Sequence, residues 1–380
     1  MLILLLPFWM WLAWLVSAKH KLVLAIVDKT VLTSGGQEHI SLNWVLNHEK
    51  FTKTSTKGYN ISKDYFGFFP LENEHYRIKG LERFSGDQLN RLSEDADVAY
   101  FTDTYGIYKN EWYSQKANTE RSGILYGGMS SQDVELLNNM KKRHKLVIVE
   151  FNSIASPTLA PIRNKFEDLF KLKWTGWTAR YFDSLDTVVN KELPHWLVND
   201  YKRGHDGHWP FHKSGISFVN DSDQVVILED GTHLNNSLPY IVTNSYGQEA
   251  YGLPEKIKYP FWFDVTLPDS QVNKVVANFV INVNSSGKAE LAKYNLPAVF
   301  PAVTMHYGND YRFYYFSGDF CDNPISITTS YFKGISFFKW LFYNSNDPVE
   351  RKSFFWNYYR PLMITILKQE YQRDKPEPKP

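Results

Sequence analysis

Acidic side chains close several hydrophobic runs of this 380-residue sequence, and their type and position suit them to chemistry. Asp28, Asp103 and Glu150 each end a run typical of a buried strand, and Asp319 follows a late run. Parallel strands end at one edge of a sheet, and ligands bind in the crevice outside that edge, so we expect these carboxylates to converge. Like charges this close need a shared proton, a cation or a basic partner. His39, in the loop after the first run, could supply positive charge or act as acid or base.

The predicted site therefore has a catalytic group and a substrate-binding group. Asp28 and Asp103 should lie within direct or single-water reach of each other, and one of them should have a raised pKa. In the alternative interpretation, the carboxylates cap helices and tie loops together. The catalytic group comprises Asp28, Asp103, Glu150 and His39, and the substrate-binding group comprises Tyr105, Asn152, Trp177 and Asp319.

Other reactive side chains indicate no second site. His205, His208 and His212 lie in a loop of glycine and proline, where spacing alone cannot turn two rings to one face, so we predict a solvated loop and no metal. Cys321 is the single cysteine and fits a small buried residue. Ser153 lacks the flanking glycines of a nucleophile elbow. We expect no cofactor.

Composition narrows the range of ligands. The 42 lysines and arginines nearly cancel the 41 aspartates and glutamates, which argues against binding nucleic acid phosphates. Aromatic residues make up 16% of the chain, and several lie beside carboxylates and amides. Most of them must build the core, but such mixed clusters also suit the apolar faces and polar edges of sugar rings. We therefore expect a carbohydrate ligand.

The elements that must position these residues alternate between strand and helix. This rhythm predicts an α/β fold with a mostly parallel sheet, flanked by helices, that carries a β-rich insertion and C-terminal helices. The aromatic stretch 64–70 reads as a loop. Strand-like runs occupy 22–27, 98–101, 123–128, 145–151 and 311–316, and helix-like runs occupy 40–47, 89–94, 130–144, 161–172, 331–343 and 352–371.

Five segments follow from this pattern. Residues 1–18 are a signal peptide or membrane anchor, and residues 19–200 form the α/β domain. Residues 201–300 are the β-rich insertion, with short strands at 216–219, 225–228, 261–266 and 275–283. Residues 301–373 supply the final strand and helices, and 374–380 form a tail.

Three segments resemble the class I glutamine-amidotransferase-like fold. They are ILYGGM at 124–129, VIVEFN at 147–152 and FYYFSGD at 313–319, and the resemblance covers roughly residues 20–180 and 300–345. Active members place a cysteine at a strand-to-helix elbow, where this chain has Asn152 and Ser153. The chain is therefore similar to the branch without amidotransferase activity, and the resemblance implies that it is not a glutamine amidotransferase.

The N-terminal segment indicates an envelope location. Residues 2–15 are apolar, and Val16 and Ala18 are the small residues that a signal peptidase reads. The run is short for a span of roughly 20 residues, and Lys19 and Lys21 follow it, which leaves the orientation open. We predict an envelope protein that binds or processes a polysaccharide or its precursor. The sequence does not decide whether it is an enzyme, but its carboxylates would suit a carboxylate-dependent hydrolase. The alternative is a non-catalytic scaffold of an envelope machine.

Overall fold

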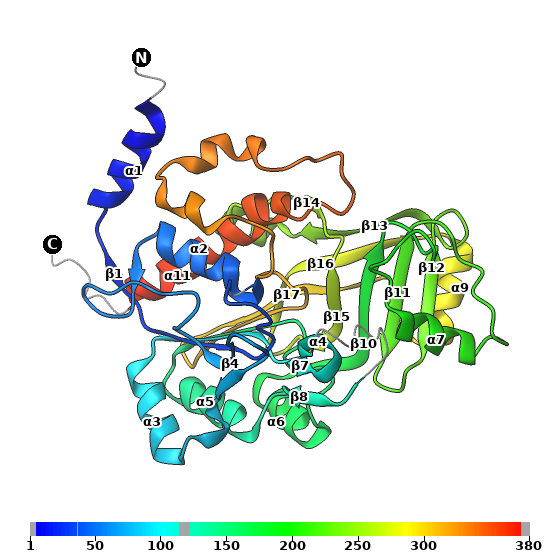
Figure 1. The fold of residues 1–380 in the computed structure, drawn as a ribbon, viewed down its shortest axis with the longest axis horizontal. Helices are drawn as coiled ribbons and strands as arrows, with labels where there is room; N and C mark the ends of the chain where they lie inside the picture. The colour runs from blue at the N-terminus through cyan, green and yellow to red at the C-terminus, as the bar shows by residue number, and fades with distance from the viewer. Residues whose placement is uncertain (1–4, 36, 114–121, 374–380) are drawn as a thin grey trace.

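The computed structural model describes residues 5–35, 37–113 and 122–373, and a ten-stranded sheet crosses its centre (Figure 1). Neighbouring strands from β18 to β4 run parallel, and the remaining pairs are antiparallel. From edge to edge the strands are β14 (Lys256–Lys258), β13 (Leu234–Thr243), β16 (Lys274–Val283), β17 (Val299–Tyr307), β18 (Arg312–Phe316), β9 (Leu146–Glu150), β6 (Val98–Asp103), β2 (Leu24–Asp28), β4 (Phe66–Pro70) and β5 (Tyr76–Lys79).

Helices cover both faces of the parallel strands (Figure 1). Helices α3 (Gly86–Asp95), α5 (Ser131–Lys142) and α6 (Ala160–Phe170) lie on one face, and α2 (Ile40–His48) and α11 (Arg360–Arg373) lie on the other. Successive strand residues point to opposite faces, so Ile26 and Tyr100 join one apolar cluster while Val27 and Phe101 join the other. Burial on both faces explains why these strands read as unbroken apolar runs. The predicted α/β class is confirmed.

Helix starts follow local sequence signals. Ser130 caps α5, because its hydroxyl accepts from the Asp133 backbone N–H at 3.1 Å while the Asp133 carboxylate accepts from the Ser130 N–H at 2.7 Å. This reciprocal pair satisfies two backbone donors that the first helical turn leaves free. The same arrangement joins Ser85 and Gln88 at the start of α3.

A second, antiparallel sheet of four strands stands against the central one. Its order is β12 (Val225–Glu229), β11 (Gly215–Asn220), β10 (Leu172–Phe182) and β15 (Trp262–Pro268). A bridge between Phe263 and Gly318 joins the two sheets. Strand β10 precedes the predicted insertion at 201–300, and β13, β14 and β16 of that insertion extend the central sheet.

Several local expectations differ from the structure. Residues Phe66–Pro70 form β4 instead of a loop, and residues Ile124–Tyr126 (β8) pair with Ile107–Tyr108 (β7) outside the central sheet. The expected helix at 331–343 consists of 3-10 turns, and the last helix contains a π-helical turn over Phe355–Tyr359 just before Pro361. Shorter elements are α1 (Leu6–Val16), β1 (His20–Lys21), β3 (Phe51–Thr52), α4 (Lys109–Trp112), α7 (His195–Arg203), α8 (Ser245–Tyr251), α9 (Ser285–Lys293) and α10 (Lys352–Phe354).

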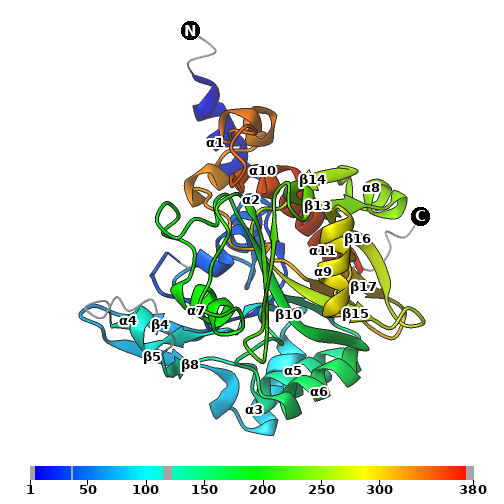
Figure 2. The same cartoon turned by 90° about the vertical axis from the view of Figure 1, so that its right-hand side faces the viewer.

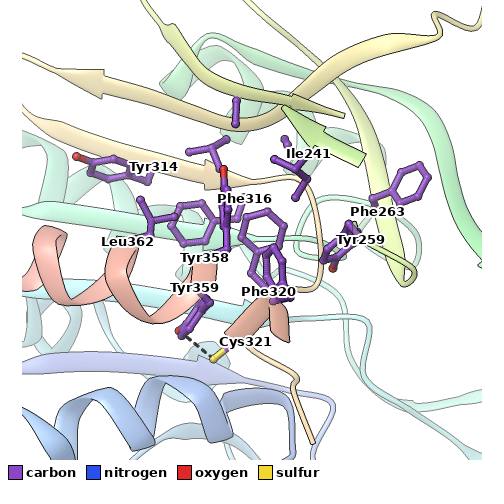
Figure 3. Close-up of a cluster of buried hydrophobic side chains, with 14 of the residues drawn as sticks. Ile241, Tyr259, Phe263, Tyr314, Phe316, Phe320, Cys321, Tyr358, Tyr359 and Leu362 are labelled. Atoms are coloured by element: carbon purple, nitrogen blue, oxygen red, sulfur yellow. Dashed lines mark hydrogen bonds between the residues drawn. The ribbon is translucent and has the colours of Figure 1, made fainter. Parts of the chain in front are cut away.

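The larger core cluster joins the C-terminal helices to the central sheet (Figure 3). Phe316 and Tyr314 of β18 face the rings of Phe320 and Tyr358, with Leu362 of α11 beside them. Phe320 packs on Phe316 with ring centroids 5.4 Å apart, and such aromatic pairs add to the burial of apolar area. Aromatic residues of the chain thus serve chiefly as core.

Helix α1 stands away from the sheet, and none of its residues is buried (Figure 1). Trp14 ties it to the body, since its indole N–H donates to the Asn47 carbonyl at 3.0 Å and its ring packs on Tyr331. Within the described residues, the length and apolarity required to cross a membrane are not reached by any helix.

Candidate functional site

A cleft of about 840 Å³ opens between the carboxyl ends of the parallel strands and the second sheet. Four of its acidic side chains come from strand ends and loops of the central sheet, namely Glu38, Asp103, Asp319 and Asp322. Asp221 and Asp223, between β11 and β12, and Glu111 also line it. Its aromatic wall comes mostly from the second sheet and α7, with Trp174, Trp196, Phe261 and Trp262. The cleft therefore places acid groups opposite ring faces, at the sheet edge where α/β proteins bind ligands.

Asp28 and His39 form a buried pair beside this cleft. The Asp28 carboxylate contacts His39 Nδ1, and His39 Nε2 lies 2.8 Å from the Ile61 carbonyl oxygen. Both ring nitrogens of His39 therefore face an oxygen atom, and the ring is held between the Asp28 carboxyl group and the backbone. His39 thus lies against Asp28, and the two side chains are buried rather than part of the cleft lining.

Asp103 pairs with Asp28 across the parallel strands and lines the cleft. Thr30 bridges the two carboxylates, because its backbone N–H donates to Asp28 at 3.1 Å and its hydroxyl donates to Asp103 at 2.7 Å. Burial raises the pKa of Asp103 to about 8, and the Asp28 charge adds to the rise, although donors from Thr30, Tyr105 and Asn152 oppose it. Asp103 therefore holds a proton near neutral pH.

Glu38, Asp319 and Asp322 form an acidic cluster in the cleft. One oxygen of each carboxylate lies within 4.8 Å of the others. Burial, and then the neighbouring carboxylates with Asp322 first, raise the pKa of Glu38 and of Asp319 well above their ordinary values. Asp322 accepts from Arg351 Nη1 at 3.2 Å, which compensates its charge. The cluster therefore combines two carboxyl groups whose pKa values are raised with a third that is paired with an arginine.

The spacing of these three carboxylates also fits a hard cation. Ca²⁺ and Mg²⁺ take oxygen ligands of this kind. Among the described residues, Glu38, Asp319 and Asp322 are the group of histidine, cysteine, aspartate and glutamate whose ligand atoms converge in this way. The loop histidines do not join such a group there: His205 stacks on Tyr201, and His212 contacts Asp186 at 3.1 Å.

Glu150 faces the core instead of the cleft. One of its oxygens accepts from the backbone N–H groups of Phe320 and Cys321 at 3.1 and 2.9 Å, and the other contacts the Tyr100 hydroxyl. Burial raises the pKa of Glu150 to about 8. The network continues through Tyr359, whose hydroxyl donates to Cys321 Sγ at 3.2 Å (Figure 3). Glu150 thus anchors the loop that carries Asp319 and Asp322 of the acidic cluster.

Of the four predicted substrate-binding residues, three line the cleft and one does not. Tyr105, Asn152 and Asp319 line the cleft. Trp177 is buried, packs edge-on against Tyr294, and does not line the cleft. Trp177 points away from the cleft because neighbouring side chains along a strand such as β10 point to opposite faces.

Sequence reasoning missed two acids of the cluster and a buried acid below it. Glu38 immediately precedes His39, and Asp322 follows Asp319 by three residues, so both lay beside predicted positions. Asp264 lies on β15, and its carboxylate accepts from the Asn152 N–H at 3.2 Å and the Tyr315 hydroxyl at 2.9 Å. Burial raises the pKa of Asp264 to about 7. Its sequence context, within an aromatic run, carried no signal for this contact.

Comparisons with known proteins do not assign the chain to a family. No protein-family model matches it, and no curated protein matches it significantly. Three solved structures are similar in part. A cytoplasmic protein from Salmonella typhimurium LT2 is 9% identical with a TM-score of 0.39, and the match covers 92% of this chain and 98% of that one. For β-galactosidase from Bacillus circulans sp. alkalophilus the identity is 11%, the TM-score 0.34 and the coverage 81% of this chain and 30% of that one, and for a protein described as ThuA-like from Bacteroides uniformis they are 8%, 0.34, and 83% and 89%. At these TM-scores none of the similarities bears on activity.

Proposed function

We propose that this protein is an envelope-associated, carboxylate-dependent hydrolase acting on a polysaccharide or its precursor. The observation that carries the proposal is the cleft itself, which joins Glu38, Asp103, Asp319 and Asp322 to a wall of aromatic rings. Converging carboxylates in an open cleft favour an enzyme over a non-catalytic scaffold.

The aromatic wall supports a sugar ligand. The ring of Trp262 lies near the Arg180 guanidinium, and Phe261 stacks under Arg351 at 3.5 Å, so arginines fix both rings. Rigid aromatic faces bind the apolar faces of sugar rings, and the nearby amide of Asn152 offers hydrogen bonds to hydroxyl groups. A cleft of this volume holds a short stretch of a polymer.

The acidic cluster supports general acid and base chemistry. The oxygens of the cluster lie within 4.8 Å of one another, a close spacing that suits a retaining pair of carboxyls and leaves no room for a water between them. A protonated Glu38 or Asp319 would give its proton to the leaving oxygen of a glycosidic bond while the Asp322 carboxylate attacks the anomeric carbon, and water would then hydrolyse the resulting ester with the first residue acting as base. The raised pKa values of Glu38 and Asp319 favour the protonated form that a general acid needs, and Arg351 pairs with the Asp322 carboxyl group.

The fold branch and the location belong to the same proposal. Asn152 and Ser153 follow β9, where active glutamine amidotransferases place their cysteine, and burial raises the pKa of the Cys321 thiol well above its ordinary value. This combination supports the branch without amidotransferase activity. The exposed apolar helix α1 supports attachment to, or export through, the cell envelope.

The test is a reducing-end assay on a panel of envelope polysaccharides with the wild-type protein and Glu38→Gln. We expect the variant to lose at least about a hundredfold in turnover, the usual contribution of a general acid. Glu72→Gln, an exposed carboxylate outside the cleft, is the matched control and should keep full activity.

Two outcomes would count against the proposal. If no polysaccharide is cleaved but one binds in a manner sensitive to Trp262→Ala, the protein is a binding scaffold. If activity is found and Glu38→Gln leaves it unchanged, the acidic cluster is not the catalytic centre.

A further inference from the structure

A second surface of the molecule is apolar and lies away from the cleft. We call it the apolar face; it combines α1 with the 3-10 turn Ile335–Leu341, two segments more than three hundred residues apart in the sequence. Figures 1 and 2 show them side by side at one end of the molecule. Its exposed members are Phe8 (50%), Trp9 (49%), Trp11 (39%), Phe337 (84%), Trp340 (64%) and Leu341 (60%).

The two halves of this face are held together. The Lys333 backbone N–H donates to the Met10 carbonyl at 3.1 Å, and the Trp14 and Tyr331 rings meet edge to face with centroids 4.8 Å apart. The face is therefore part of the folded body and not a loose N-terminal tail. Phe337 and Trp340 point outward, so the core does not account for their size.

The two segments that build the face carry charges of one sign, although Lys333 also pairs with Glu49 from outside them at 3.7 Å. Residues 5–21 and 331–343 contain Lys19, Lys21, Lys333 and Lys339 and no aspartate or glutamate. Aromatic residues with lysines at their margin are typical of the water boundary of a bilayer, where tryptophan rings lie at headgroup depth and lysines contact anionic lipids. Helix α1, with 11 residues, is long enough to lie along such a boundary without spanning the bilayer.

We propose that the apolar face docks on an anionic lipid bilayer, with Phe337, Trp340 and Leu341 entering the interface beside α1. The inference rests on the proposed envelope association and adds a second contact made by the folded body. Two separated contacts fix the orientation of the protein on the membrane, whereas α1 alone leaves it free to rotate.

The test is co-sedimentation of the full chain with vesicles of phosphatidylcholine mixed with phosphatidylglycerol. We expect the wild type to bind and the double variant Phe337→Ser, Trp340→Ser to bind at least about tenfold more weakly, because two large apolar side chains no longer leave water. The control is Val188→Ser, Val189→Ser, at positions 76% and 71% exposed and outside the face, and should bind as the wild type. Lys339→Glu, which keeps the apolar side chains, should weaken binding to these vesicles and not to pure phosphatidylcholine.

The outcomes separate this inference from the proposed function. If the double variant binds vesicles as tightly as the wild type does, α1 alone anchors the protein and the inference is wrong, while envelope association stands. If the wild type does not bind vesicles, the inference is wrong and so is attachment of the protein to a membrane, while the hydrolase activity is still decided by the reducing-end assay. If the wild type is a dimer and the double variant a monomer, with vesicle binding unchanged, a second copy of the chain covers the face and the inference is again wrong.

Discussion

Asp103→Asn should make the protein more stable and less active, and the gain in stability should depend on pH. The Asp103 carboxyl has an ordinary pKa of 3.8, which rises to about 8 on folding because burial penalises its charge. Between these values the native state holds a proton that the unfolded chain has released. The stabilising proton is fully present below about pH 4, and its contribution is lost as pH rises through about 8.

The size of this contribution to stability follows from the difference between the two pKa values of Asp103. Each pH unit between the two pKa values lowers the free energy of unfolding by about 1.4 kcal/mol, so the whole interval is worth roughly 6 kcal/mol. Water in the cleft reduces this value, and we expect Asp103→Asn to gain about 2 to 4 kcal/mol over the wild type near pH 8 and close to nothing near pH 4. The amide oxygen can still accept from Thr30 and from the Tyr105 N–H, which bond one oxygen of Asp103.

The assay is urea unfolding of the wild type and the variant near pH 4, 6 and 8. Asp95→Asn, at an exposed position of α3, is the matched control and should show no comparable dependence on pH. The same Asp103→Asn protein, and Asp28→Asn likewise, should lose ligand binding or turnover while staying folded. A variant that is destabilised near pH 8 would refute the reasoning, because it would mean that Asp103 is ionised and that its hydrogen-bond donors outweigh burial.

Three further predictions concern the network and the cleft wall. The protein should release no ammonia from glutamine; release that disappears in Cys321→Ala would contradict this. Glu150→Ala should lower the free energy of unfolding in urea by more than about 2 kcal/mol, because two buried N–H groups lose their acceptor; an unchanged value would show that water replaces the carboxylate. Trp262→Ala should weaken glycan binding, measured by calorimetry, by about tenfold, whereas unchanged binding would place the sugar elsewhere.

The sequence was most informative where one physical rule acts alone. Burial on both faces makes the strands around Ile26, Tyr100 and Ile148 continuous apolar runs, so their class and the strand-end position of Asp28 and Asp103 could be predicted. Parallel strands end at one edge of the sheet, so the sequence also allowed us to predict that Asp103 and Asp319 would lie in one cleft, where the structure has them.

The sequence was least informative where tertiary contacts decide. Glu150 ends its strand as predicted, but two backbone N–H groups from a loop 170 residues later turn its carboxylate into the core. Trp177 and Trp174 share one strand, and only the register of β10 with its neighbours decides which of them lines the cleft. Glu38 gained its environment from Asp319 and Asp322, which no local pattern connects with it.

The two-sided construction of the cleft has a consequence for how such a protein can diversify. The acids stand on loops of the central sheet, which the core and the Glu150 network hold in place, while the aromatic wall is contributed largely by the separate β10 to β15 sheet and α7. Loops and inserted elements tolerate sequence change far better than a packed scaffold does. Mutation of the wall can therefore retarget the protein to a different polymer while the acidic centre is inherited unchanged, so that relatives sharing Glu38, Asp103, Asp319 and Asp322 need not share a ligand.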